Sequence, residues 1–453
     1  MSFLLDNKKI ELNNMTDISS NITCSIEEMD LTKLSKTELL EKCEELGIKK
    51  CKSKNKGELI DLINSKNLSV KNDTDEKLDF TTENIIVPIS EKYKVVSLFT
   101  GICGMDIGFS ENIIVHKNSI ANDFKENILS DSEKYKDFVV LKNKNYEIVF
   151  QNDILSGAKR ICELNKIAYN YNTNSIYTLI ENNFQFPNAD VVIGGFPCND
   201  FSHAGKREGF NSSKSHNLKD EANDTNNRGS LYKSFVKVVD KVKPKIFIAE
   251  NVYGLLTMKN EPIKQIIADF EKLGYDVNYQ LVKANEYGIP QKRWRVIIMG
   301  INKHRKINLL EENWNFITKN KITCYVGNYL KHLSEPDESD DISQQVYSKA
   351  KKLDKGQGQT EINLNDFAPT MRAEHHGNIE FRRHINGINS DEIHLPERRL
   401  TVREAGLIQT FPPNFIFNTK KNMTGYKYIG NAVPPLLSYI ISDKVNELLN
   451  YYY

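Results

Sequence analysis

Short apolar runs alternate with helix-like stretches through most of residues 92–302, and this alternation limits the possible folds more than any other feature. Each run has the length of a buried strand, and the segments between several runs show the helical spacing of apolar residues. The runs are KVVSLF, NIIVHKNSIAND, YEIVFQND, ADVVIGGF, PKIFIAEN and RWRVIIMG. Strands that alternate with helices predict an α/β fold with a doubly wound, mostly parallel sheet.

The rest of the 453-residue chain divides into segments of different character. Residues 1–30 are polar and show no sustained period, so we expect a mobile tail. Residues 67–91 are polar and lean acidic, which predicts a linker. Residues 303–395 break the alternation with polar, charged sequence and predict an inserted region, after which residues 396–453 return to apolar sequence and complete the core that 92–302 begins.

Residues 31–66 predict a separate pair of short helices. Ser35 and Glu38 form a capping-box pattern, and Gly47 is a typical helix stop. A lysine-rich turn follows, and a second helix carries Leu59 and Ile60. Two short helices with a basic connection resemble a SAP module, a small DNA-binding helix pair. The alternative is a helical hairpin that only packs on the main domain.

Composition bears on the cellular compartment of the chain and on its binding to membranes and nucleic acids. Hydrophobic residues make up 39%, no run of eighteen apolar residues occurs, and the N-terminus lacks a secretory signal, so we expect no membrane span. Seven cysteines without a Cys-x-x-Cys pair predict neither a disulfide framework nor a zinc site, and they favour a reducing intracellular compartment. The net charge is only +1, so nucleic-acid binding requires local basic patches.

The stretch VVSLFTGICGMDIGF predicts a cofactor-binding turn. The strand ends near Leu98 and Phe99, a turn holds Gly101 and Gly104, and a helix follows. Glycines allow a sharp turn and a close approach of backbone to ligand, and a strand–turn–helix unit of this kind binds nucleotide cofactors. The spacing differs from G-x-G-x-x-G, which disfavours a dinucleotide and with it a nicotinamide oxidoreductase.

Acidic residues follow the next two predicted strands. Asp123 ends the second strand region, where a carboxylate suits the hydroxyls of a ribose, and Phe124 beside it could stack on adenine. Asp153 follows the third strand and could accept the adenine amino group. The glycine turn after the first strand and the carboxylates after the second and third strands together predict an adenosine ligand without phosphates, such as S-adenosylmethionine.

A second site is predicted around the lone cysteine of GGFPCNDFSHAG. Cys198 follows the fourth strand, at the carboxyl edge where α/β proteins bind ligands. A helix N-terminus or a basic neighbour can lower the pKa of such a thiol and make it a nucleophile, whereas the alternative is a buried cysteine that acts as a small hydrophobe. Glu250 ends the next strand as a candidate acid or base, and alternation on a strand would point Arg293 and Arg295 to the same side.

These motifs together resemble the DNA (cytosine-5)-methyltransferases over residues 92–453. Seven matches follow in the family's order: LFTGICGMDIGF, GGFPCNDFSHAGKREGF, RGSLYKSF, AENVYGLL, YGIPQKRWRVIIMG, RRLTVREAGLIQTFPPNF and YIGNAVPP. The resemblance implies a Rossmann-like S-adenosylmethionine-dependent methyltransferase fold. It also implies that residues 303–395 form the target-recognition region.

The resemblance further implies a mechanism. Cys198 would attack carbon 6 of a target cytosine, and Glu250 would hydrogen-bond the ring nitrogen and the amino group. Arg295 would bind the base carbonyl oxygen while Arg293 orders the site. Carbon 5 would then accept the methyl group from S-adenosylmethionine. The cytosine must leave the duplex to be reached.

The resemblance assigns binding residues as well. The cofactor positions are Leu98, Phe99, Thr100, Gly101, Gly104, Asp123, Phe124, Asp153, Ile154 and Asn431. The expected DNA contacts are Ser202, Lys206, Arg207, Gln291 and Arg372. We expect double-stranded DNA as the partner, one protein copy acting on it, and no metal, because the histidines near Arg372 lack acidic and cysteine partners at ligand spacing.

The chain departs from the family pattern at three positions, and two alternative functions stay open. Cys103 stands where the family usually has glycine, Asn199 replaces glutamine, and Asp123 replaces the commoner glutamate. One alternative is a tRNA cytosine-5 methyltransferase of the same fold, and the other is a non-catalytic DNA-binding regulator. The expected location is the cytoplasm of a prokaryote, or a nucleus or viral factory otherwise.

Overall fold

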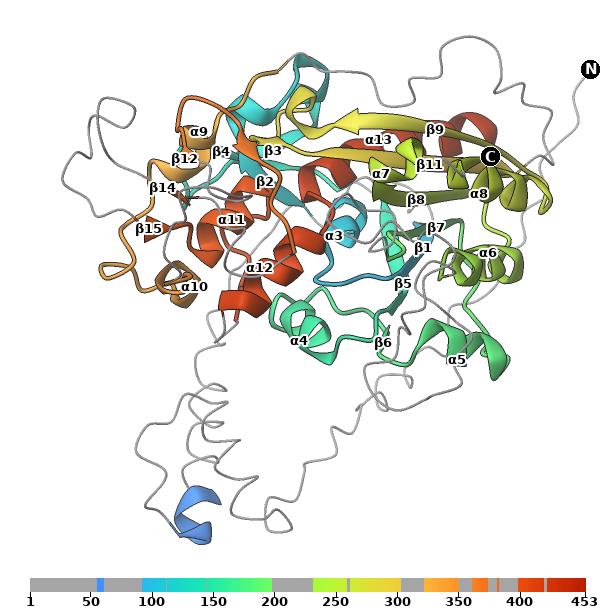
Figure 1. Cartoon of the computed structure of the whole chain (residues 1–453), viewed down its shortest axis with the longest axis horizontal. Helices are drawn as coiled ribbons and strands as arrows, with labels where there is room; N and C mark the ends of the chain where they lie inside the picture. The colour runs from blue at the N-terminus through green and yellow to red at the C-terminus, as the bar shows by residue number, and fades with distance from the viewer. Residues whose placement is uncertain are drawn as a thin grey trace, which may run out of the picture. The chain divides into compact units, whose positions relative to one another are not determined.

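The computed structural model describes residues 55–60, 92–110, 112–143, 145–197, 231–258, 261–302, 322–349, 361–373, 381–382, 398–418 and 422–453 (Figure 1). The chain divides into two units, Met1–Ile89 and Ser90–Tyr453. In the first unit, residues 56–60 are helical, and Asn55 and Glu58 cap the start of this helix by reciprocal hydrogen bonds. The remainder of the predicted SAP-like pair lies outside the described residues.

A seven-stranded sheet forms the centre of the second unit (Figure 1). The strand order is β6-β5-β1-β7-β8-β11-β9. The pairs from β6 to β8 are parallel, and β11 pairs antiparallel with both β8 and β9. The strands are β1 (Tyr93–Leu98), β5 (Tyr146–Asn152), β6 (Tyr171–Asn172), β7 (Val191–Gly194), β8 (Ile246–Val252), β9 (Tyr275–Lys283) and β11 (Trp294–Asn302). The predicted α/β class with a mostly parallel sheet is confirmed.

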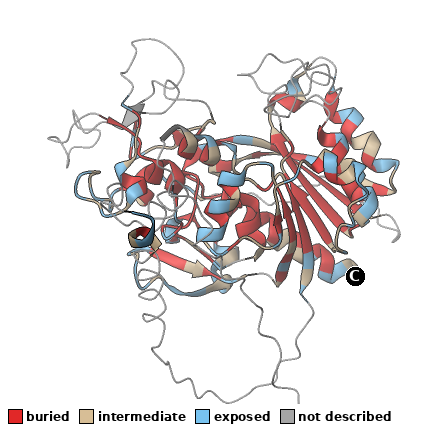
Figure 2. Ribbon diagram, turned by 90° about the horizontal axis from the view of Figure 1, so that it is seen from below, coloured by how far each residue is buried: buried red, intermediate tan, exposed pale blue. Residues whose placement is uncertain are grey.

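Helices cover both faces of the sheet, as a doubly wound fold requires. All four residues of β7 and the first six of β8 are buried, which explains their continuous apolar sequence (Figure 2). One face packs against α3 (Gly104–Ser110), α4 (Ser156–Leu164) and α13 (Pro435–Tyr452). The other packs against α5 (Ile176–Glu181), α6 (Leu231–Val242) and α8 (Pro262–Glu271), with the short α7 (Gly254–Thr257) nearby.

Two glycines bring α3 against α13 across more than three hundred residues of sequence. A Cβ on Gly104 would lie 2.5 Å from the Val433 carbonyl oxygen, and one on Gly108 would lie 2.4 Å from the backbone of Ser438. Only glycine permits backbones to approach this closely. The C-terminal segment therefore closes onto the helix that follows β1.

The placement predicted for the second strand is wrong. The run before Asp123 forms β2 (Ile113–His116), which pairs with β4 (Phe138–Leu141) in a separate antiparallel sheet that β3 (Ile128–Asp131) completes. The strand beside β1 is β5 instead. The helix α3 follows β1, and the chain then passes through β2, β3 and β4 before it returns to the main sheet at β5, parallel to β1.

Small elements, most of them after residue 322, add to the same core. The helices are α9 (Val326–Leu330), α10 (Ile342–Gln345), α11 (Val402–Ile408) and α12 (Asn422–Asn431). The short strands are β10 (Gln291–Lys292), β12 (Glu361–Ile362), β13 (Ala368–Pro369), β14 (Phe381–Arg382) and β15 (Arg398–Arg399). Thr401 and Glu404 cap α11 by a reciprocal pair of hydrogen bonds, so this helix begins where the sequence changes from RRL to VRE.

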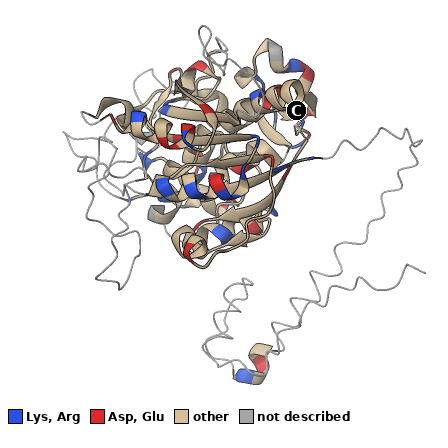
Figure 3. Cartoon of the chain, turned by 90° about the vertical axis from the view of Figure 1, so that its right-hand side faces the viewer, with Lys and Arg blue, Asp and Glu red and all other residues tan. Residues whose placement is uncertain are grey.

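Charged groups of both signs are interspersed over the described ribbon (Figure 3). No helix in the described ranges is long and apolar enough to cross a membrane.

Candidate active site

The turn after β1 forms the floor of a cavity at the carboxyl edge of the sheet. Phe99, Gly101 and Cys103 all have positive φ values, of 54°, 55° and 63°. The family's usual glycine at position 103 is explained by this geometry, because a left-handed conformation strains other residues. Asp153 Oδ2 accepts a hydrogen bond from the Gly101 amide at 2.9 Å, and the Tyr171 hydroxyl donates to the Gly101 carbonyl at 2.8 Å. The turn is thus held from both sides.

A disulfide joins this turn to α4, contrary to the expectation from the cysteine pattern. Cys103 pairs with Cys162, with their Cα atoms 6.4 Å apart. The two cysteines are 59 residues apart in sequence. Their proximity follows from α4 packing behind the cofactor turn, which residue spacing alone cannot reveal.

Asp153, which was predicted to bind the adenine amino group, follows the strand that pairs with β1. It follows β5, and its Oδ1 accepts from the Leu155 amide at 2.9 Å. Burial raises the pKa of this carboxyl, and the two backbone amides oppose that effect. Asp123 lies in a 3-10 segment after β2, in the separate sheet. Phe124 packs near Tyr439, with ring centroids 6.3 Å apart, rather than on the cavity.

A buried polar network supports the turn from beneath. Ser97 Oγ donates to Asp106 Oδ2 at 3.0 Å, and Gln151 Nε2 donates to Oδ1 at 2.7 Å. Ser97 Oγ also lies 2.8 Å from the Thr100 hydroxyl. Burial raises the pKa of Asp106 to about 6, although the hydrogen bonds from Gln151 and Ser97 favour the charged form. Sequence reasoning missed Asp106, and its signal was an acidic residue inside an otherwise apolar helix start.

Glu250 and Arg295 form the second part of the site. Arg295 Nε lies 2.8 Å from Glu250 Oε1, and the two side chains are only 13% and 10% exposed. Glu250 lines the cavity, and its other oxygen lies 3.1 Å from where a Cβ on Gly195 would be. Gly195 therefore leaves room for the carboxylate. Asn251 Nδ2 donates to the Phe196 carbonyl at 3.4 Å, which holds the segment before Pro197 against β8.

Arg293 does not share the side of Arg295, so that prediction is wrong. Successive backbone hydrogen bonds, from the Gln291 amide to Ile289 and from the Arg293 amide to Gln291, break the extended alternation there. Arg293 is 1% exposed. Its Nη1 donates to the Met371 carbonyl at 3.1 Å, and its Nη2 donates to Gly430 at 3.0 Å and to Ala432 at 2.9 Å. The guanidinium thus fastens the segment around residue 371 to the end of α12.

Gln291 is also placed differently from its predicted role. Its side chain is fully buried, donates to Gln409 Oε1 at 2.6 Å and accepts from the Met371 amide at 3.0 Å. Both ends of the amide are used inside the protein, so a contact with DNA is not available to it in this structure. Arg372 follows on the surface at intermediate exposure, with its backbone against Gly430.

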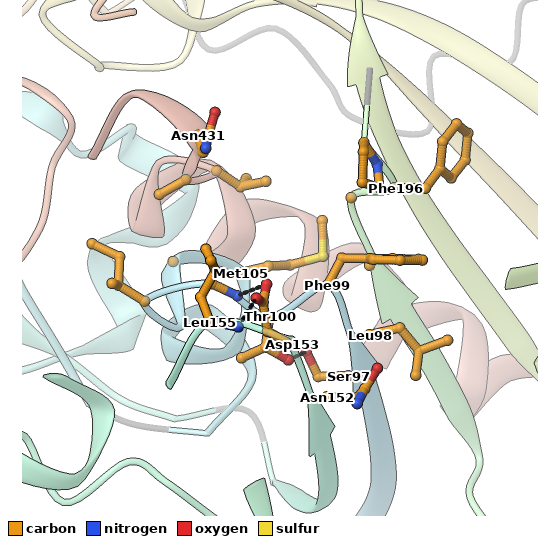
Figure 4. Close-up of a pocket in the computed structure, with 18 of the residues that line it drawn as sticks. Ser97, Leu98, Phe99, Thr100, Met105, Asn152, Asp153, Leu155, Phe196 and Asn431 are labelled. Atoms are coloured by element: carbon orange, nitrogen blue, oxygen red, sulfur yellow. Dashed lines mark hydrogen bonds between the residues drawn. The ribbon is translucent and has the colours of Figure 1, made fainter. Parts of the chain in front are cut away.

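The cavity itself has a volume of about 270 Å³. This is just below the range of about 300–1,000 Å³ typical of small-molecule pockets. Figure 4 shows the Phe99 and Phe196 rings on the sheet side, with Asp153 below them and Asn431 on α12. The predicted residues that line it are Leu98, Phe99, Thr100, Gly101, Gly104, Asp153, Ile154, Glu250 and Asn431.

Several predicted residues fall outside the part of the chain that the structure describes. Cys198, Ser202, Lys206 and Arg207 are outside the described residues, as is the side chain of Asp123. Lining residues that sequence reasoning missed include Asn152, Ser175, Ile176, Pro197, Lys427 and Tyr428. Ser175 and Ile176 follow β6, a two-residue strand too short to produce a sequence signal.

Two bacterial methyltransferases are similar to this chain over most of its length. The Bacillus subtilis type II methyltransferase M.BsuRI is 29% identical over 400 residues, covering 83% of each chain. The Lysinibacillus sphaericus type II methyltransferase M.BspRI is 30% identical over 388 residues, covering 79% of this chain and 82% of its own.

Solved structures share the fold. One is a putative DNA modification methyltransferase encoded within a prophage of E. coli, with a TM-score of 0.51, 20% identity and coverage of 79% of this chain and 99% of its own. Another is the S. pombe Dnmt2 methyltransferase, with a TM-score of 0.51, 14% identity and the same coverages.

The family profile of the C-5 cytosine-specific DNA methylases matches residues 139–447, which include β5, β7, β8, β11 and all of α12. The matched range covers Cys198 and the Glu250–Arg295 pair. This chain therefore belongs to the C-5 cytosine-specific DNA methylase family.

Proposed function

We propose that the chain transfers a methyl group from S-adenosylmethionine to carbon 5 of a flipped-out cytosine in duplex DNA, through a covalent adduct on Cys198. One observation carries the proposal: the Glu250 carboxylate, held by Arg295 at 2.8 Å, lies against Gly195 in a cavity that Pro197 also lines. The nucleophile is the next residue after Pro197. An acid and a guanidinium thus lie at the edge of the sheet where the described chain reaches Pro197, and the proposal assigns the nucleophile to the residue that follows.

The cavity suits an adenosine-type cofactor. Asp153 ends the strand beside β1, where a carboxylate can accept from both hydroxyls of a ribose. Ile154 is 42% exposed and Phe99 lines the same space, so both can pack on a purine ring. Asn431 and Lys427 line the α12 side and offer polar groups to the amino-acid end. When bound there, S-adenosylmethionine supplies an electrophilic methyl group.

The residues of this chain then carry the pyrimidine chemistry. The Cys198 thiolate adds to carbon 6, which breaks the 5,6 double bond and places electron density on carbon 5. Glu250 hydrogen-bonds the ring nitrogen and the amino group, and Arg295 binds the carbonyl oxygen, so the negative charge is stabilised. After carbon 5 is methylated, it loses its proton to a base. The Cys198 sulfur then leaves and the double bond is restored.

DNA recognition is assigned to the loop after Cys198 and to residues 303–395. Ser202, Lys206 and Arg207 are expected to contact the strand around the flipped base, since its extrusion costs a few kcal/mol that protein contacts must offset. Arg372 is the expected base-reading residue, because arginine pairs with guanine edges in the major groove. We propose that one copy of the protein acts on the duplex.

Bisulfite sequencing of DNA from cells that express the chain tests this function. Protected cytosines at one recurring sequence are expected, and the same experiment identifies that sequence. Purified protein with duplex DNA and tRNA side by side should methylate the DNA alone. Methylation of tRNA alone, or of neither, would contradict the proposal.

A further inference from the structure

An exposed tryptophan precedes Arg295 at the start of β11. Trp294 is 41% exposed and begins β11, one residue before Arg295. Arg295 Nη1 donates to the Trp294 carbonyl at 2.7 Å while its Nε holds Glu250. The backbone of Trp294 thus takes part in positioning Arg295, and its indole ring points to the other face of the strand.

Two further side chains complete a patch around this ring. Trp294 and Lys283 are directly paired on β11 and β9, so they share a face. Lys283 Nζ lies 4.8 Å from the centre of the indole ring, within the range of a cation–π contact. The Tyr253 ring meets the indole edge-on, at 5.4 Å and 79°, three residues after Glu250. We call Tyr253, Lys283 and Trp294 the aromatic–lysine patch.

The chemistry of this patch fits a nucleotide strand. Aromatic faces stack on bases or sugars without regard to sequence, and a neighbouring lysine neutralises phosphate. A flipped cytosine removes a stacking partner from its neighbours, which leaves faces free for such contacts. Tyr253 follows β8, Lys283 ends β9 and Trp294 begins β11. The strands β8 and β11 also carry Glu250 and Arg295.

We propose that the aromatic–lysine patch binds the DNA strand next to the flipped cytosine, with Trp294 against a sugar or base and Lys283 on a phosphate. The inference rests on the proposed function, because that function places the target base at Glu250 and Arg295. It adds a binding surface that does not touch the reacting atoms. Its loss should therefore change DNA affinity rather than the chemical step.

Fluorescence tests the contact in the folded protein. The chain has two tryptophans, so Trp314→Phe leaves Trp294 as the single emitter. The probe is a duplex that carries the sequence found by bisulfite sequencing, and binding is followed separately by anisotropy of labelled DNA. Trp294 emission should change in parallel with anisotropy. Binding by anisotropy with constant Trp294 emission would overturn the proposal.

Kinetics provide the second test. Trp294→Ala should raise KM for DNA about tenfold with kcat within about twofold, and Trp294→Phe should restore most of the affinity. Lys283→Ala should reduce the slope of log affinity against log salt by about one. Tyr279→Ala is the matched control, because Tyr279 is a 38% exposed aromatic on the same face of β9, farther from the site.

The outcomes separate the two proposals. Unchanged KM in both Trp294→Ala and Lys283→Ala would overturn the patch while methylation by the native chain upholds the function. An equal rise of KM in Tyr279→Ala would also overturn it, because the effect would then belong to the strand and not to the patch. Absence of methylation in the native chain would overturn the function itself.

Discussion

Arg293 and Arg295 are two residues apart but belong to different regions of the molecule. Arg295 belongs to the edge of the sheet, where its Nε lies 2.8 Å from the Glu250 carboxylate at the cavity. Arg293 belongs to the C-terminal region, where it donates to the carbonyls of Met371, Gly430 and Ala432. The Arg295–Glu250 pair borders the cavity. Arg293 is buried, and its contacts are made inside the protein.

One short motif, QKRWR, therefore contains one arginine that contacts a cavity residue and another that holds backbone segments together. Arg295 lies next to the cavity, because its partner Glu250 lines it. Arg293 acts at a distance, because two of its acceptors flank Asn431, which also lines the cavity. We therefore regard Arg293 as a positioning residue and Arg295 as a catalytic one.

Glu250→Gln should have the largest effect, and it belongs to the region of Arg295. The amide cannot transfer a proton to the ring nitrogen and take it back, so the charge that develops on the ring is less well stabilised and kcat should fall about a thousandfold. The thermal midpoint should stay within a few degrees, because the side chain keeps its shape. Single-turnover methyl transfer measures the rate, and calorimetry measures stability. A rate within tenfold of the native value would remove Glu250 from the mechanism.

Arg293→Ala should instead act on the fold. Three buried carbonyls lose a charged donor, which should lower the free energy of unfolding by about 3 kcal/mol. Cofactor affinity should fall as well, because the end of α12 is released. Denaturant unfolding and cofactor titration measure both. Arg295→Lys is the control: it keeps a positive charge beside the buried Glu250 carboxylate, so it should lose activity at nearly native stability. If the two variants were equally destabilised, the proposed division of roles would be wrong.

Asp106→Asn should have the smallest effect, visible as a change in pH dependence. Burial raises the pKa of Asp106 to about 6, so the folded state binds this proton more tightly than the unfolded chain. The contribution of Asp106 to stability is therefore greatest below about pH 4 and declines as pH rises to about 6. Between these limits, the unfolding free energy of the variant should gain about 2 kcal/mol relative to the native chain. Parallel unfolding curves at pH 4 and pH 7 measure this, and a pH-independent difference would contradict it.

Much of the fold was predictable because buried parallel strands have a continuous apolar sequence. The runs that became β1, β5, β7, β8 and β11 were all identified as strands. Their neighbours were harder to predict, because an apolar run does not reveal which strand it pairs with. The run at Ile113–His116 was therefore identified as a strand but not as part of a separate sheet. As a result, the carboxylate that follows the strand beside β1 is Asp153 and not Asp123.

The site was predictable where motifs have fixed backbone geometry. The turn at Gly101 and the end of α12 at Asn431 both line the cavity as predicted. Local deviations were not predictable: the broken alternation at Arg293 depends on hydrogen bonds within the turn. Asp106 was missed because its partners, Ser97 and Gln151, come together only after β1 and β5 pair.

The covalent adduct is the central claim, and trapping it is the most direct measurement. A duplex with 5-fluorocytosine at the target position cannot lose a proton from carbon 5, so the enzyme should remain attached after methyl transfer. With S-adenosylmethionine present, the account predicts a denaturation-resistant complex whose cross-linked peptide contains Cys198, and no such complex with Cys198→Ser. A native enzyme that methylates ordinary DNA but forms no such complex, or forms it through another residue, would contradict the account.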